Sequence, residues 1–247
     1  MSAILLNPGP VTLSQRVREA MLSADLCHRE PEFASLQSAI RRKLIDVYNL
    51  EETKWAAGLL TGSGTAAVEA MISTLVPGDG KLLSIENGVY GERITKIAEQ
   101  YGIPLAVANF EWTAPIDVAQ IDRQLGEDQT ITHLAVIHHE TTTGRLNDLS
   151  ALLEVCQHRN VKVLLDGVSS FGAEDIPFEY ENLIACAATA NKCLHGVPGT
   201  AFVMVRRDAL DQAHPRNLYL NLKSYVDAQD NNGTPFTQSV QTFYALD

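Results

Sequence analysis

Two residues with reactive side chains, Asp166 and Lys192, follow apolar runs in the second half of the 247-residue sequence. Asp166 ends the run "VKVLLD" (161–166), and Lys192 comes just after "LIACAATA" (183–190). A carboxylate at the end of a buried strand is costly unless it meets a cation or a strong hydrogen-bond donor. A partly desolvated lysine has a lowered pKa and can attack a carbonyl carbon to form a Schiff base. Each residue also has a purely structural interpretation, as a helix cap for Asp166 and as a surface ion pair for Lys192.

Two further segments place hydroxyl groups after apolar runs. The segment "LLTGSGTAAVEAMI" (59–72) is typical of a strand, a turn at Ser63, Gly64 and Thr65, and an apolar helix. Backbone N–H groups at a helix start attract anions such as phosphate, although the serine and threonine could also serve only as helix caps. In "AVIHHETTTGRLNDL" a hydroxyl-rich stretch begins at Thr141. The two adjacent histidines before it are expected to face opposite sides of a strand, so we expect no metal site there.

The elements that must position these groups alternate between strands and helices, which predicts a doubly wound α/β domain. Apolar runs without strict alternation predict strands that are buried on both faces of a mostly parallel sheet, at residues 54–61, 81–86, 104–110, 132–140, 161–166, 183–190 and 200–207. Helices are expected at residues 14–22, 32–49, 64–76, 90–101, 117–126 and 148–159, and one more after "TPF". In such a sheet ligands bind beyond the carboxyl ends of the strands, so all of the polar groups above are expected at one edge.

Composition and charge argue against several classes of function. The formal net charge of −11 disfavours binding to nucleic acids or anionic membranes, and no apolar run reaches the roughly 20 residues of a membrane-spanning helix. The start "MSAILLNPGP" lacks the features of a secretory signal. The four cysteines show neither CxxC pairs nor metal-ligand spacing, so we expect reduced thiols in a cytoplasmic protein.

The chain resembles the class V (fold type I) pyridoxal phosphate-dependent aminotransferases, and within them the 2-aminoethylphosphonate–pyruvate transaminases. The matching segments occur in order over nearly the whole chain: "LLNPGPVTLSQRVREAM", "GSGTAAVEAM", "ENGVYGERI", "HHETTTGRLNDL", "LLDGVSSFGAEDI", "ANKCLHGVPGTAFVMVRR" and "DNNGTPFTQSVQTFYAL". The block from Asp166 to Lys192 is the most specific of them. The resemblance implies the large domain of PLP-dependent transferase fold type I, with a mostly parallel seven-stranded sheet flanked by helices.

The resemblance also implies a role for each matched residue around the cofactor, pyridoxal 5'-phosphate. Lys192 would form the Schiff base and carry the proton, and Asp166 would pair with the pyridine nitrogen. The phosphate would be held by Ser63, Gly64 and Thr65. Tyr90 and Val168 would cover the two faces of the ring, and Thr141 would bind the phenolic oxygen. Asn191, next to the lysine, would also bind the cofactor. Thr234 would contact the cofactor phosphate of a neighbouring subunit, which implies a homodimer. The "NPGP" segment (7–10), with Pro8 and Gly9, would line the substrate pocket.

The expected reaction transfers an amino group from 2-aminoethylphosphonate to pyruvate and gives phosphonoacetaldehyde and alanine. A serine/alanine–glyoxylate type of aminotransferase stays open, because "DLCHREPEF" (25–33) differs from the corresponding segment of phosphonate transaminases. The family continues into a small C-terminal domain whose arginine binds the substrate's anionic group. We expect residues 1–247 to hold only the N-terminal segment and the large domain. A truncated, non-catalytic subunit that binds pyridoxal phosphate is therefore the second alternative.

Overall fold

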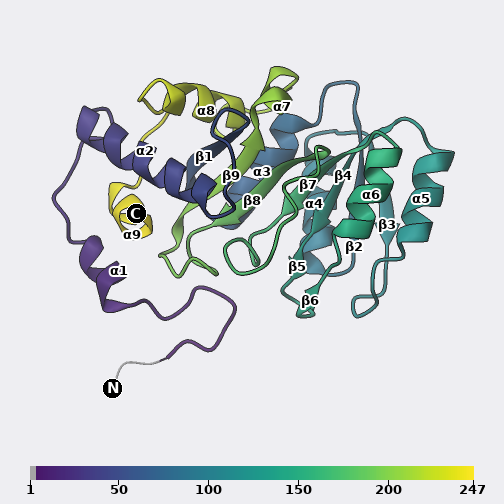
Figure 1. The fold of residues 1–247 in the computed structure, drawn as a ribbon, viewed down its shortest axis with the longest axis horizontal. Coiled ribbons are helices and arrows are strands. Elements are labelled where there is room, and N and C mark those ends of the chain that lie inside the picture. The colour runs from purple at the N-terminus through teal and green to yellow at the C-terminus, as the bar shows by residue number, and fades with distance from the viewer. Residues whose placement is uncertain (1–3) are drawn as a thin grey trace.

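A central sheet lies between two groups of helices in the computed structural model of this chain, which describes residues 4–247 (Figure 1). The first three residues of the predicted N-terminal segment lie outside the described residues. The strands are β1 (Trp55–Gly62), β2 (Lys81–Glu86), β3 (Leu105–Asn109), β4 (Ile131–Ile137), β5 (His139–Glu140), β6 (Arg145–Leu146), β7 (Lys162–Asp166), β8 (Leu183–Thr189) and β9 (Gly199–Arg206). The helices are α1 (Gln15–Ala20), α2 (Pro31–Asp46), α3 (Gly64–Leu75), α4 (Val89–Gln100), α5 (Val118–Glu127), α6 (Ser150–His158), α7 (Arg207–Asp211), α8 (Leu222–Asp230) and α9 (Val240–Leu246).

The main sheet has seven strands in the order β1-β9-β8-β7-β4-β2-β3, as the sequence predicted for a mostly parallel sheet. The pairs from β8 through β3 are parallel, whereas β9 runs antiparallel to both β8 and β1. All strands of this sheet except β9 therefore point their carboxyl ends toward the same edge. The turns that follow β1, β2, β4, β7 and β8 meet there, together with the loop that enters β9.

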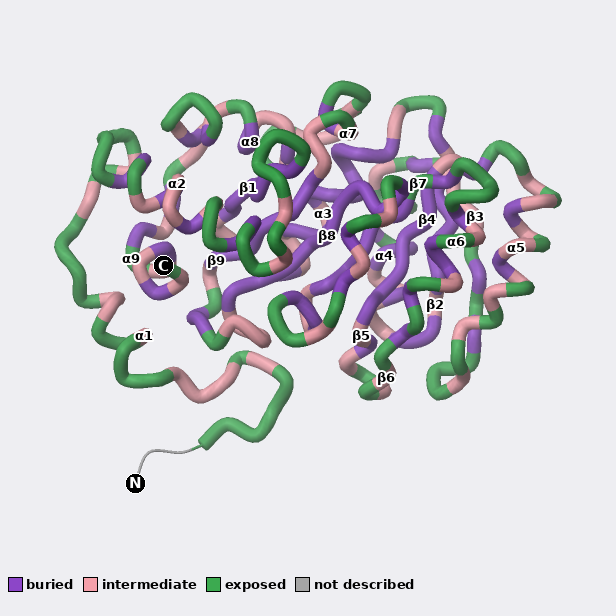
Figure 2. Tube along the Cα trace, viewed as in Figure 1, coloured by how far each residue is buried: buried purple, intermediate pink, exposed green. Residues whose placement is uncertain are grey.

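Two apolar layers cover the faces of the sheet, as Figure 2 shows by the buried strands between partly exposed helices. Helices α2, α5, α6 and α9 pack on one face, and α3, α4, α7 and α8 pack on the other. Strand β1 serves both layers, because Trp55 and Leu59 belong to the first and Ala56 and Leu60 to the second. Each large apolar side chain buried in this way contributes about 1.5–3 kcal/mol, which holds the sheet edge and its loops in a defined arrangement.

Most predicted elements agree with the structure to within a few residues, and the exceptions have local causes. The predicted strand 132–140 divides into β4 and β5, because the chain leaves the sheet after Ile137 and forms a small hairpin with β6. Gly144 makes that turn at a φ of +70°, which is favourable for glycine. Helices α7 and α8 were not predicted, and the tail helix α9 begins only at Val240. Within residues 4–247, no helix combines the length and the apolar character needed to cross a membrane.

Candidate active site

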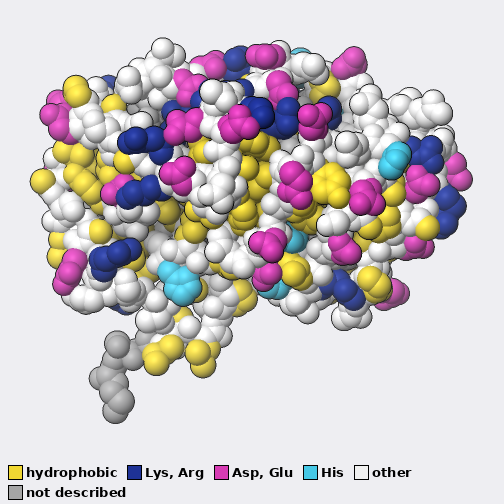
Figure 3. Space-filling model, viewed as in Figure 1, with side chains coloured by type: hydrophobic (Ala, Val, Ile, Leu, Met, Phe, Trp, Pro, Cys, Tyr) yellow, Lys and Arg dark blue, Asp and Glu magenta, His cyan; other side chains and the backbone are white. Residues whose placement is uncertain are grey.

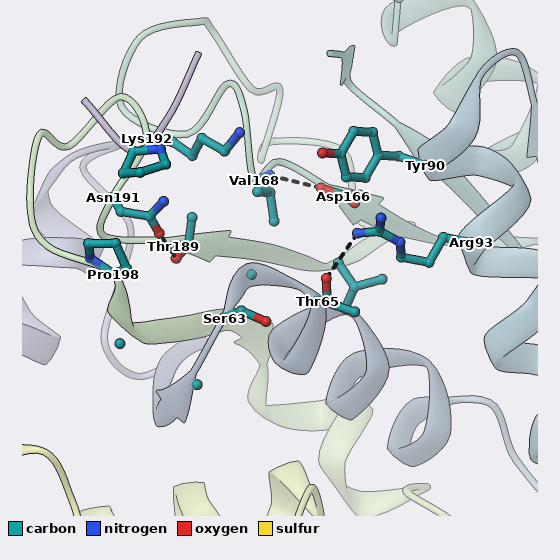
Figure 4. Close-up of a pocket in the computed structure, with 15 residues that line it drawn as sticks. Ser63, Thr65, Tyr90, Arg93, Asp166, Val168, Thr189, Asn191, Lys192 and Pro198 are labelled. Atoms are coloured by element: carbon teal, nitrogen blue, oxygen red, sulfur yellow. Dashed lines mark hydrogen bonds between the residues drawn. The ribbon is translucent and has the colours of Figure 1, made fainter. Parts of the chain in front are cut away.

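A cavity of about 300 Å³ opens at the edge of the sheet where the carboxyl ends of the parallel strands meet (Figure 4). Its walls come from the β1–α3 turn, the first turns of α4, the end of β7 and the β8–β9 loop. Eight of the residues predicted to bind a cofactor line it: Ser63, Gly64, Thr65, Tyr90, Asp166, Val168, Asn191 and Lys192. These eight residues, from Ser63 to Lys192, come from distant parts of the sequence and meet in one cavity.

Asp166 ends β7 as a buried carboxyl group. Its Oδ1 accepts a hydrogen bond of 2.9 Å from the backbone N–H of Val168, and its side chain faces the cavity. No ion pair to Asp166 forms among residues 4–247. Burial raises the pKa of Asp166 to about 6, against the opposing effect of the Val168 hydrogen bond. The carboxyl group is therefore poised to gain from a cationic ligand group placed in the cavity.

Lys192 reaches the same cavity from the loop after β8, and Figure 4 shows its side chain extending into the space beside Asp166 and Tyr90. Its side chain is half-buried, and burial lowers the pKa of the amine, while the charges of Asp166 and Cys193 oppose that effect. Within the described chain the amine forms no ion pair with a carboxylate. A surface ion pair is thus not its role here, and a desolvated, unpaired amine is a competent nucleophile.

The β1–α3 turn presents the start of a 12-residue helix to the cavity. Ser63 is the residue before the helix, but its hydroxyl makes no capping hydrogen bond, so it is left for a ligand. A Cβ atom at Gly64 would lie 2.9 Å from the γ-carbons of Val168, which explains why glycine stands where this turn meets the loop after β7. The first N–H groups of a helix have no partner within it and attract anions. The turn therefore has the geometry of an anion site, and its predicted role toward phosphate stays a prediction.

Four predicted residues do not line the cavity. Thr141 lies nearby, with its Oγ1 2.7 Å from the hydroxyl of Ser169. Thr234 is buried away from it and bonds to Phe236 and Gln238 of its own chain. Gly9 packs against the Lys192 side chain, and Pro8 is exposed beside it. Their predicted roles toward cofactor, partner and substrate stay predictions.

Arg93 is a lining residue that the reasoning from sequence did not single out, whereas Pro10 was predicted to line a pocket as part of residues 7–10. Pro10 belongs to the same "NPGP" segment as the predicted Pro8 and Gly9. Arg93 follows Tyr90 by three residues on α4, a spacing that places both side chains on one helix face. The spacing of Tyr90 and Arg93 within "ENGVYGERI" could therefore have identified Arg93 as a lining residue. Thr189 also lines the cavity, and its hydroxyl donates to Oδ1 of Asn191 at 2.8 Å.

The two adjacent histidines have protein partners close to the site. Nδ1 of His138 lies 2.9 Å from the hydroxyl of Ser170, and Nδ1 of His139 lies 3.3 Å from the carbonyl oxygen of Ser169. Burial lowers the pKa of His138 to about 4, which keeps its ring neutral at physiological pH. Among residues 4–247 no group of three or more metal-ligating side chains is close enough to hold a metal ion.

The buried carboxyl group makes the stability of the cofactor-free protein depend on pH in a specific way. In the unfolded chain Asp166 loses its proton near its ordinary pKa of 3.8, whereas in the folded chain it keeps the proton until about pH 6. The contribution of Asp166 to the free energy of unfolding therefore falls as the pH rises from about 4 to 6, and it stays low above pH 6. Asp166→Asn removes the charge and keeps an acceptor for Val168, so we expect it to be more stable than the wild type at pH 7.5, by up to about 3 kcal/mol.

Urea unfolding at pH 4.5 and pH 7.5 checks this expectation. The advantage of the variant should shrink at the lower pH. Asp122→Asn is the matched control, because Asp122 is an exposed carboxylate whose pKa is lowered by Arg159. An Asp166 variant that is less stable than the wild type at pH 7.5 would contradict the assigned cost of burying this charge.

The family described as aminotransferase class-V matches residues 20–243 of this chain. Curated relatives named 2-aminoethylphosphonate–pyruvate transaminase are 37% identical to it. The alignment with the protein of one Bacillus cereus strain covers 90% of this chain and 60% of that protein. The alignment with the Bacillus anthracis protein covers 98% of this chain and 68% of that protein. The chain thus spans 60% to 68% of the length of these two relatives.

Solved structures of aminotransferases share the fold described above. An aspartate aminotransferase from Thermus thermophilus superposes with a TM-score of 0.90 at 27% identity, covering 99% of this chain and 68% of that one. An alanine–glyoxylate aminotransferase from Nostoc sp. gives a TM-score of 0.90 at 25% identity, covering 100% and 66%.

Proposed function

Because this chain belongs to the class-V aminotransferase family, we propose that its cavity binds pyridoxal 5'-phosphate and that the whole enzyme transfers an amino group from 2-aminoethylphosphonate to pyruvate. The products are phosphonoacetaldehyde and alanine. Enzymes of this family depend on pyridoxal phosphate, and the substrates are those named for the curated relatives at 37% identity.

One observation carries the proposal: an amine and a buried carboxyl group that form no ion pair within residues 4–247 face a single cavity together with an open helix N-terminus. These three features match the three functional groups of pyridoxal phosphate. The amine of Lys192 fits the aldehyde, the carboxyl group of Asp166 fits the protonated pyridine nitrogen, and the start of α3 fits the phosphate. The residues present therefore fit the cofactor.

When bound, the cofactor supplies an aldehyde and an electron-withdrawing ring that stabilises negative charge at the substrate carbon. The chain's own residues supply the remainder. Asp166, when ionised, would keep a pyridine nitrogen protonated. Lys192 provides the nucleophilic amine and then moves a proton at its Nζ. Tyr90 and Val168 place apolar surface in the cavity, which excludes water from the reacting atoms.

We also propose that residues 4–247 form the N-terminal segment and the large domain of a homodimeric enzyme. Support for a partner surface comes from the apolar N-terminal segment, where Ile4 is 73% exposed and Leu6 is 95% exposed. Helix α1, which follows, has no buried residue. Figure 3 shows this end of the chain projecting from the molecule with apolar side chains in view. The four unpaired cysteines support a reducing compartment such as the cytoplasm.

The amino donor can be tested by absorbance spectroscopy of the protein loaded with pyridoxal phosphate. Addition of 2-aminoethylphosphonate is expected to convert the cofactor to its amine form, and pyruvate is expected to restore the starting spectrum. Lys192→Ala, loaded in the same way, serves as the control without the reactive amine.

The same titration distinguishes the alternatives. Conversion by serine or alanine, with glyoxylate as acceptor and no response to 2-aminoethylphosphonate, would replace the proposed reaction with the glyoxylate type. A bound cofactor that no amino donor converts would identify a non-catalytic subunit. Either result would refute the proposed activity.

A further inference from the structure

Arg93 is the charged cavity residue that the proposed function leaves without a role. It lies on α4, three residues after Tyr90, so both side chains leave the same face of the helix toward the cavity. Figure 4 shows its guanidinium group close to Tyr90, Asp166 and Thr65. Within the described chain no carboxylate forms an ion pair with Arg93. A half-buried, unpaired guanidinium group in a ligand cavity calls for an explanation.

Among residues 4–247, the one hydrogen bond that Arg93 donates goes to a residue at the start of α3, the proposed anion site. Its Nη1 donates to Oγ1 of Thr65 at 3.0 Å. A threonine hydroxyl has one proton to donate and two lone pairs that accept. Because Arg93 occupies a lone pair, the hydroxyl proton of Thr65 stays available for an acceptor in the cavity. The contact thus prepares Thr65 to donate to an anion at the start of α3.

A second contact fixes the guanidinium group in this place. Its central carbon lies 4.6 Å from the centre of the Tyr90 ring, within the range of a cation–π interaction. The ring and the Thr65 hydroxyl together restrain Arg93 at the boundary between the anion site and the carboxyl group of Asp166. The positive charge of Arg93 acts on both, since it attracts an anion and favours the ionised form of Asp166.

We propose that Arg93 is a positioning residue for phosphate binding, which orients the Thr65 hydroxyl toward the anion and adds a fixed positive charge beside it. The ligand is a phosphate monoester, and its identity as pyridoxal phosphate rests on the proposed function. Arg93 acts through Thr65 and through its charge, so its effect is specific to ligands that carry the phosphate.

The experiment compares binding of pyridoxal phosphate, pyridoxal and inorganic phosphate to the cofactor-free wild type, Arg93→Met and Arg93→Lys. Pyridoxal has the same ring and aldehyde but no phosphate, so the ratio of the two dissociation constants isolates the phosphate. In Arg93→Met the preference for pyridoxal phosphate over pyridoxal is expected to fall by roughly tenfold or more, the effect of losing a charge-assisted hydrogen bond. The binding of inorganic phosphate should weaken by a similar factor. Arg93→Lys should restore most of the ratio. Arg123→Met, which removes an exposed arginine of α5, is the matched control and should leave it unchanged.

A merely structural role would weaken pyridoxal as much as pyridoxal phosphate, and an unchanged ratio in Arg93→Met overturns the proposal. Failure of Arg93→Lys to restore the ratio overturns the contribution of charge. If the wild type binds inorganic phosphate but not pyridoxal phosphate, the proposed function fails. The proposal for Arg93 is then decided by whether Arg93→Met weakens the binding of inorganic phosphate. If the wild type binds no phosphate compound, both proposals are refuted.

Discussion

Replacing Lys192 with alanine is expected to abolish covalent attachment of pyridoxal phosphate and to lower turnover at least about a thousand-fold. The half-buried amine lies in the cavity, forms no ion pair within the described chain, and has a pKa lowered by burial. Borohydride reduction of the loaded wild type, followed by peptide mapping, should place the label on Lys192. The variant should give no label but keep noncovalent binding, because the anion site and Asp166 are intact.

Lys223→Ala is the control for this experiment. Lys223 lies on α8 and pairs with Asp227 at 3.1 Å, so its removal should change neither labelling nor turnover. Recovery of the label on a lysine other than Lys192, or full turnover in Lys192→Ala, would refute the assignment of the nucleophile.

Replacing Asp166 with alanine is expected to weaken pyridoxal phosphate binding and to lower turnover by about 100- to 5000-fold, which corresponds to the roughly 3–5 kcal/mol lost when one partner of a buried charge pair is removed. The carboxyl group is the acid that faces the cavity from the end of β7 and is free of ion pairs in the described chain. Without it the ring nitrogen loses the group that keeps it protonated. Dissociation constants and single-turnover rates measure the two effects.

Asp166→Asn separates this chemical role from a structural one. The amide keeps the size of the side chain and an acceptor for the N–H of Val168, and we expect the cofactor-free variant to be more stable than the wild type at pH 7.5. A variant that is more stable yet as inactive as Asp166→Ala assigns the loss to the missing charge. Turnover near that of the wild type in Asp166→Asn would remove Asp166 from the mechanism.

Local patterns in the sequence were sufficient to predict most elements that carry the site. Continuous apolar runs such as 161–166 and 183–190 are buried on both faces, which favours central strands of a parallel sheet. Since parallel strands place their carboxyl ends at one edge, the positions of Asp166 and Lys192 at strand ends were enough to predict that they meet. The Ser63–Thr65 turn followed from the same rule. These predictions depend only on periodicity and on the direction of neighbouring strands.

Other features depend on contacts between segments that are distant in sequence, and only the tertiary structure decided them. Antiparallel β9 sits between β8 and β1 because its backbone groups pair with both, and nothing within 199–206 specifies those partners. Arg93 and Thr65 are 28 residues apart along the chain, and they meet because α3 and α4 pack side by side. Helical spacing places Arg93 on the face of Tyr90, but the packing of that face determines what it touches. The residue types of the site are thus readable from the sequence, whereas their partners depend on how the layers pack.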